Sequence, residues 1–139
     1  MGAATGPAGM IYRRTDYAQP YFDDLPGPGI YPVYHLMADL GAAGGRGLIA
    51  SKASHGVAAL CYRGAAGPVL WLANLTAKPV SVRTKGFAGP AKLAMLDEAT
   101  FAQATTDEQF LNRRAKRLAR VGSLSLRPYA LARIAALAE

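Results

Sequence analysis

The sequence predicts a mainly β fold: an antiparallel β-sandwich of about seven strands, with an N-terminal strand, loop and helix and one inserted helix. The length of 139 residues suits a single domain with one core. Past Gly47, short runs of strand-forming residues are bounded by Gly, Pro, Ser or Lys. Turn residues separate these runs about every 8–12 residues, a spacing that is typical of sandwiches.

The strand pattern occurs in residues 48–50, 57–62, 69–76, 80–84, 93–96, 123–126 and 129–134. The third run, which contains Trp71, is apolar on both faces, so we expect it at the centre of a sheet. An inserted helix is expected between the fifth and sixth runs. Thr106 and Gln109 have capping-box spacing there, and a narrow apolar stripe follows as far as Gly122.

A short strand, a loop and a helix are expected before the sandwich. The apolar run 10–12 is long enough for one brief strand. Residues 15–29 are aromatic and rich in turn residues, which indicates an ordered loop. Pro32 suits the first helical position, and apolar residues recur at three- and four-residue spacing until glycines begin at Gly41. We therefore divide the chain into a strand-loop-helix unit, residues 1–43, and a sandwich domain, residues 44–139.

The apolar content is that of a folded protein outside the membrane. Apolar residues make up 51% of the chain and charged residues 18%. The longest apolar stretches are much shorter than the roughly 20 residues that cross a bilayer, and the first residues lack the features of a secretory signal. We therefore expect a cytoplasmic protein. The single Cys61 falls in a strand pattern, which predicts a small buried hydrophobe.

The net charge of +7 raises the question of a nucleic-acid partner. Five of the sixteen Lys and Arg residues lie between Arg113 and Arg120, on the expected inserted helix. Apart from Phe110, no aromatic residue accompanies them for base stacking. A solvated helix face is therefore favoured, and a nucleic-acid-binding protein using Arg113–Arg120 stays as an alternative.

No complete catalytic, metal or cofactor site can be assembled from the sequence. Glycosidases need two carboxylates facing each other, but the doublets Asp23–Asp24 and Asp97–Glu98 read as solvated turn acids. His35 and Asp39 are one helical turn apart without a nucleophile or third ligand, which favours an ordinary surface pair. His55 is expected in a hairpin turn. We therefore predict no catalytic residue, no metal site and no cofactor.

Aromatic residues are concentrated near the N-terminus. Candidate carbohydrate contacts are Tyr17, Tyr21 and Phe22, all in the expected loop. Such rings pack on the faces of sugars, but they also anchor long loops to a core. Anchoring is the favoured interpretation, and carbohydrate contact stays open.

Several segments together resemble the end of bacterial sugar-acid lactonases of the D-apionate lactonase type. The resemblance is carried by the sequences of residues 31–40 (YPVYHLMADL), 70–76 (LWLANLT), 96–100 (LDEAT) and 124–134 (LSLRPYALARI). It covers residues 5–134. It implies a glycoside-hydrolase-like (β/α)8 barrel followed by a β-sandwich, with residues 9–13 similar to the last barrel strand and Tyr31–Leu40 similar to the last barrel helix.

The resemblance implies the non-catalytic C-terminal portion of a carbohydrate-active hydrolase or lactonase. The partner would be the (β/α)8 barrel covering the Tyr31–Leu40 helix. Exposure of Val33, Leu36, Met37 and Leu40 would favour such a barrel, whereas their burial on the sandwich would favour a self-sufficient domain. The alternative is a stand-alone carbohydrate-binding module, in which Tyr17, Tyr21 or Trp71 would line a flat exposed platform.

Overall fold

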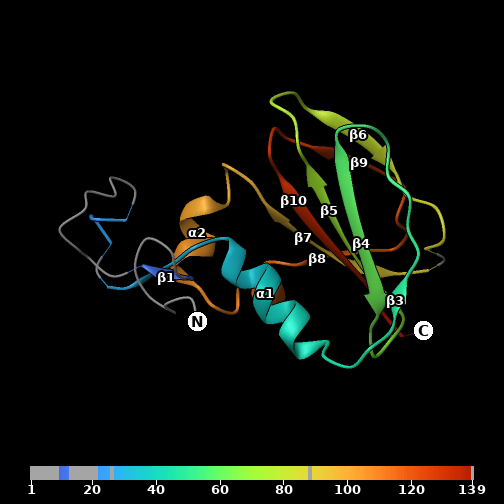
Figure 1. The fold of residues 1–139 in the computed structure, drawn as a ribbon, viewed down its shortest axis with the longest axis horizontal. Helices are drawn as coiled ribbons and strands as arrows, with labels where there is room; N and C mark the ends of the chain where they lie inside the picture. The colour runs from blue at the N-terminus through green and yellow to red at the C-terminus, as the bar shows by residue number, and fades with distance from the viewer. Residues whose placement is uncertain (1–9, 13–21, 26, 88, 139) are drawn as a thin grey trace.

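The computed structural model describes residues 10–12, 22–25, 27–87 and 89–138, and Figure 1 shows their layered arrangement. The helices are α1 (Val33–Ala42), α2 (Phe101–Thr106) and α3 (Phe110–Arg113). The strands are β1 (Ile11–Tyr12), β2 (Gly29–Ile30), β3 (Leu48–Ile49), β4 (Val57–Arg63), β5 (Pro68–Asn74), β6 (Val80–Arg83), β7 (Ala91–Leu96), β8 (Lys116–Leu118), β9 (Ser123–Leu126) and β10 (Leu131–Ala136).

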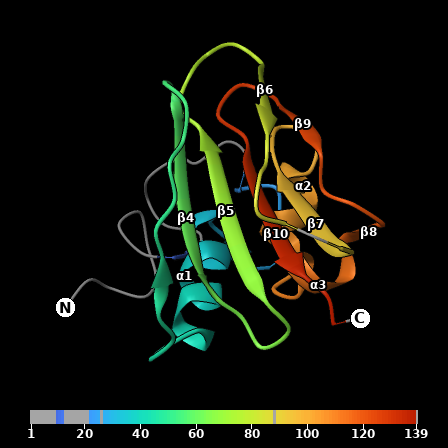
Figure 2. The same ribbon diagram turned by 90° about the vertical axis from the view of Figure 1, so that its right-hand side faces the viewer.

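The predicted β-sandwich is confirmed. Six strands form one antiparallel sheet in the order β3-β4-β5-β10-β7-β8, and β6 and β9 form a second sheet of two strands. Each of the seven expected runs contains a strand. Figure 2 shows β6 and β9 standing over the β10 and β7 side of the large sheet, away from β4.

Two hydrophobic cores lie on the two faces of the large sheet. Along β5, Leu70 and Leu72 join the core shared with β6 and β9, whereas Val69 and Trp71 join the core shared with the helices. This alternation is the period-two geometry of a strand that is buried on both faces. β5 lies between β4 and β10, which confirms its predicted central place.

The N-terminal elements cover the helix side of the sheet. Pro32 is the N-cap of α1, so the helix starts at Val33, one residue after the expected start, and it ends at Ala42. Leu36 and Leu40 pack on the core beneath α1, because apolar residues at this spacing form one stripe of a helix. Thus one face of α1 is buried on the sandwich.

An aromatic cluster joins the strand pair β1 and β2 to α2. The ring of Phe22 lies 5.1 Å from that of Tyr12, 4.8 Å from that of Tyr31 and 5.8 Å from that of Phe101, measured between centroids. Gly29 lies directly against this cluster, where a Cβ atom would come within 2.6 Å of Phe22 Cδ1. Any larger residue at this position would displace the buried ring.

The inserted helix expected as far as Gly122 is wrong. The chain instead forms the short helices α2 and α3 and then the edge strand β8, in which Arg117 lies opposite Lys92 of β7. Thr106 ends α2 and does not cap a new helix. The free edge of β7 offers unpaired backbone groups, and a short strand with cationic side chains suits an exposed sheet edge. Pairing with β8 gives the backbone groups at the edge of β7 hydrogen-bond partners. A continued helix would leave them without these partners, and its narrow apolar stripe would bury little surface in return.

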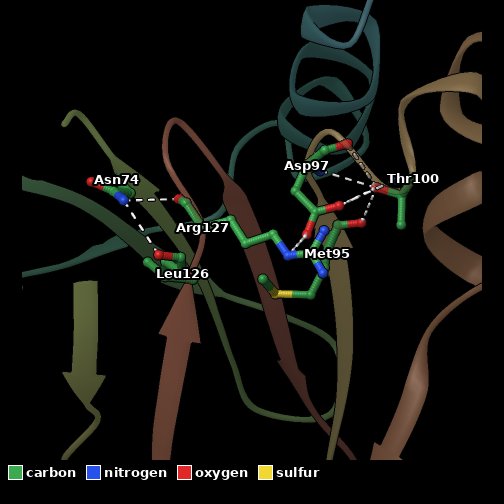
Figure 3. Close-up of polar contacts among 6 residues, drawn as sticks. All are labelled: Asn74, Met95, Asp97, Thr100, Leu126 and Arg127. Atoms are coloured by element: carbon green, nitrogen blue, oxygen red, sulfur yellow. Dashed lines mark hydrogen bonds and ion pairs between the residues drawn. The ribbon is translucent and has the colours of Figure 1, made fainter. Parts of the chain in front are cut away.

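Asn74, at the end of β5, ties two connections of the sandwich together. Its Nδ2 donates to the carbonyl oxygens of Leu126 (3.3 Å) and Arg127 (2.8 Å), as Figure 3 shows, and to that of Lys78 (2.7 Å). Its Oδ1 accepts hydrogen bonds from the backbone N–H (2.9 Å) and the hydroxyl (2.8 Å) of Thr76. The side chain is only 2% exposed, so water cannot replace these bonds.

We expect Asn74→Ala to lower the free energy of unfolding by about 2–4 kcal/mol, because the carbonyl groups that accept hydrogen bonds from Asn74 would lose their donor. Urea unfolding followed by tryptophan fluorescence measures this loss. The matched control is Asn112→Ala, since Asn112 is exposed and its side chain donates one long hydrogen bond, to Gln109 Oε1 at 3.3 Å. The control should change stability by less than about 0.5 kcal/mol, and equal effects of the two substitutions would contradict the role of Asn74.

Candidate functional site

Of the three candidate carbohydrate contacts, one, Phe22, lies among the described residues. Tyr17 and Tyr21 lie outside these residues. Phe22 is 7% exposed and is enclosed by the aromatic cluster. Trp71 is 3% exposed, so the expectation that it lines a flat exposed platform is wrong. Its ring lies on the face of β5 that α1 covers.

A polar cluster lies between α1 and the large sheet, centred on Asp39. The carboxylate oxygen Oδ1 accepts a hydrogen bond from Arg133 Nη2 at 2.7 Å, which is also a salt bridge. The other oxygen, Oδ2, accepts hydrogen bonds from the hydroxyl of Tyr62 (2.6 Å) and from Trp71 Nε1 (2.7 Å). The three donors come from β4, β5 and β10, so one carboxylate fastens α1 to three neighbouring strands.

These contacts shift the pKa values of Asp39 and Tyr62. Burial alone would raise the pKa of Asp39, but hydrogen bonds from Arg133, Tyr62 and Trp71 outweigh burial and hold the pKa below its ordinary value. Burial and the Asp39 carboxylate together raise the pKa of Tyr62 to about 12. At neutral pH the carboxylate is therefore charged and the phenol keeps the proton that it donates.

His35 forms a second attachment of α1. It is 1% exposed, and its Nε2 lies 2.7 Å from the carbonyl oxygen of Ala104 in the last turn of α2. Since a carbonyl can only accept, Nε2 carries the proton. The interpretation of His35 and Asp39 as an ordinary surface pair is wrong, because both side chains face protein and not solvent.

The sequence contains one sign of this cluster, the charged residue Arg133 on an apolar face of a strand. In β10 it shares a face with Leu131 and Ala135, two residues that belong to the core beneath the helices. A cation at such a position requires a buried partner. Asp39 lies on the same stripe of α1 as Leu36 and Leu40, and it is the acid that this position required.

The outer side of α1 differs from its inner side. Val33 is 47% exposed and Met37, one helical turn later, is 50% exposed. Met10 is 36% exposed, and its carbonyl oxygen accepts a hydrogen bond from the backbone N–H of Tyr31, just before α1. We call Met10, Val33 and Met37 the outer apolar face.

The acidic doublets do not form a facing pair. Asp97 accepts a hydrogen bond from the backbone N–H of Thr100 at 3.1 Å, and Figure 3 shows Arg127 approaching its other oxygen, at 3.9 Å. Asp23 accepts a hydrogen bond from the hydroxyl of Tyr12. Within the described part of the chain, no cluster of three or more His, Cys, Asp or Glu side chains could hold a metal ion.

The basic residues are spread over α3, β8 and the connections beside them. Arg113 forms an exposed ion pair with Asp107 at 3.2 Å, and Arg114, Lys116, Arg117 and Arg120 are exposed. Because the chain changes from helix to strand within this segment, these cations do not share the helix face that the nucleic-acid alternative required. His55 is exposed in the turn before β4, as expected, and Cys61 is buried, as predicted.

One family model matches the chain: D-apionate lactonase, C-terminal immunoglobulin-like domain, over residues 54–134. This is more than half of the chain, and it runs from the turn before β4 into β10. No curated protein matches the chain. Of the polar cluster, Tyr62, Trp71 and Arg133 lie inside the matched segment and Asp39 lies outside it. Among the helices of the described residues, none has the length and apolar character to cross a membrane.

We expect Asp39→Asn to lower the free energy of unfolding by about 2–4 kcal/mol, because it leaves Arg133 largely buried without a counter-charge. Equilibrium urea unfolding measures the effect. Asp107→Asn is the matched control, since it breaks an exposed pair that should contribute less than about 1 kcal/mol. Similar losses in both variants would contradict the anchoring role of Asp39.

The depressed pKa of Asp39 predicts a particular loss of stability in acid. The unfolded chain releases this proton near the ordinary value of 3.8, and the folded chain releases it at lower pH. The carboxylate therefore stabilises the fold above that value, and this contribution disappears as pH falls through the folded pKa. The stability difference between wild type and Asp39→Asn should be steady from about pH 5 to pH 7 and shrink below about pH 4. Unfolding curves at each pH measure it, and a difference that persists unchanged in acid would refute the assignment.

Proposed function

Because the chain belongs to the family of D-apionate lactonase C-terminal immunoglobulin-like domains, we propose that it is the non-catalytic C-terminal domain of a lactonase-like, carbohydrate-active hydrolase. Its role is to pack on the catalytic (β/α)8 barrel through the outer apolar face. The polar cluster around Asp39 is an anchor in this proposal and not a catalytic centre, since both carboxylate oxygens of Asp39 already accept hydrogen bonds from Arg133, Tyr62 and Trp71. Within the cluster only the buried Nε of Arg133 has no hydrogen-bond partner.

The observation that carries the proposal is the exposure of Val33 and Met37. They lie four residues apart on α1, so they share one side of the helix. Large apolar side chains gathered on one rigid element favour a protein partner, whereas isolated ones are normal on any surface. Leu48 in the edge strand β3 and Leu75 after β5 are exposed singly and belong to that second kind.

The anchoring of α1 makes its outer face suitable for docking. Asp39 and His35 hold the inner side of the helix on the sheet and on α2. A preformed helix does not have to be ordered when a partner binds, so less of the contact energy is lost. The anchor thus supports a function for the exposed residues Val33 and Met37, which lie beside the buried stripe of the same helix.

Binding to a separately produced (β/α)8 barrel of a D-apionate lactonase tests the proposal. We expect Val33→Glu with Met37→Glu to weaken this binding at least about tenfold, since two charges would enter an apolar contact. Isothermal titration calorimetry measures the affinity, and circular dichroism confirms that the variant is folded.

The matched control is Leu48→Glu with Leu75→Glu, which adds the same charges at exposed apolar positions away from α1. It should bind the barrel as the wild type does. If wild type shows no affinity for the barrel, or if both double variants bind equally, the proposed role of the outer apolar face is wrong.

A further inference from the structure

A groove lies on the side of the large sheet opposite the helices. Its volume is about 690 Å³. Its floor consists of the side chains of β4 and β5 that point away from α1, namely Val57, Ala59, Leu70 and Leu72. The groove exists because the second sheet has only two strands, β6 and β9, which stand over the other half of the large sheet (Figure 2).

Two segments form the walls of this groove. One wall runs from β6 to Phe87, and the other is the connection from Ile49 to Ser54. Phe87 is partly buried against the same core as the floor. The floor residues Val57, Leu70 and Leu72 are each less than a tenth exposed, so the floor of the groove is part of the core.

The charges around the groove have one sign. Lys52, Arg83 and Lys85 line it and are exposed, and no Asp or Glu is among its lining residues. Among the described residues, these cations form no salt bridge with an acid, since the salt bridges there use Arg113, Arg127 and Arg133. A groove of this size with an apolar floor and polar groups at its edge is typical of small-molecule sites.

We propose that this groove binds a small anionic amphiphile, a molecule with an apolar chain and one carboxylate. The chain lies on the floor formed by β4 and β5, and the carboxylate reaches the cations at the rim. A neutral sugar fits less well, because the floor is aliphatic and offers neither a flat aromatic platform nor a buried hydrogen-bonding side chain.

Decanoate is the test ligand. Decylammonium, which has a chain of the same length and the opposite charge, is the control ligand. The chain's single cysteine, Cys61, lies in the lining of the groove and reports occupancy. We expect decanoate to bind saturably in calorimetry and to slow the reaction of Cys61 with iodoacetamide. Decylammonium should do neither, because three cations at the rim repel it.

The charge variant is Lys52→Gln, Arg83→Gln and Lys85→Gln in one chain. It should weaken decanoate binding about tenfold, as expected for the loss of several exposed ion pairs. The control variant is Arg114→Gln, Lys116→Gln and Arg117→Gln, which changes the net charge equally but lies near and on β8. Its affinity should equal that of wild type. All six positions are exposed, so both variants are expected to fold.

Three outcomes would overturn the proposal: no saturable binding of decanoate, equal binding of decylammonium, or equal weakening in the two triple variants. A fourth variant, Ala59→Phe, fills the floor and should abolish binding while the charges stay in place. If Ala59→Phe does not fold, the charge variants still decide the matter. None of these results depends on the outer apolar face of α1, so the groove and the proposed function succeed or fail separately.

Discussion

The contact between Asp39 and Arg133 is the interaction on which the arrangement of the layers depends. Arg133 projects from β10, the strand between β5 and β7, into the core shared with the helices. A cation at such a position is costly unless a carboxylate meets it there. Only α1 supplies that carboxylate, and the 2.7 Å contact therefore sets where α1 lies on the sheet. Tyr62 and Trp71 use the second oxygen, so a shift of the helix would break bonds to three strands at once.

The segments that resemble the lactonase family contain the residues that hold the sandwich together. Asn74 belongs to the run of residues 70–76 and bonds the turn after β5 to the connection between β9 and β10. Arg133 belongs to the run of residues 124–134 and anchors α1. Both side chains are largely buried, at 2% exposure for Asn74 and 16% for the side chain of Arg133. Their hydrogen bonds therefore follow from the need to satisfy buried groups.

The sequence was sufficient for the sandwich but not for its polar contacts. The strand pattern in runs such as 69–76 reflects burial on a sheet, because buried positions carry apolar residues and can be recognised from residue type alone. By contrast, β8 forms because the edge of β7 needs a partner, and that need arises far from Lys116–Leu118 in the chain. The prediction that Asp39 lies on the helix surface was wrong for the same reason. The pattern of the helix alone does not show that Arg133, far away in the sequence, lies beneath it on the sheet. The one local sign was Arg133 itself, a cation on an otherwise apolar strand face.

The apolar residues of α1 fall into two groups with different surroundings. Leu36 and Leu40 pack on the sandwich, while Val33 and Met37 are about half exposed. Asking whether all four residues are exposed or buried therefore has no single answer, because the sandwich covers Leu36 and Leu40 and leaves Val33 and Met37, at the edge of the same broad stripe, exposed. The inner side of the helix is held by a salt bridge and a buried histidine, contacts that need no second protein. A helix held in this way keeps its position whether or not Val33 and Met37 are covered, so the fold of the described residues does not depend on the proposed docking.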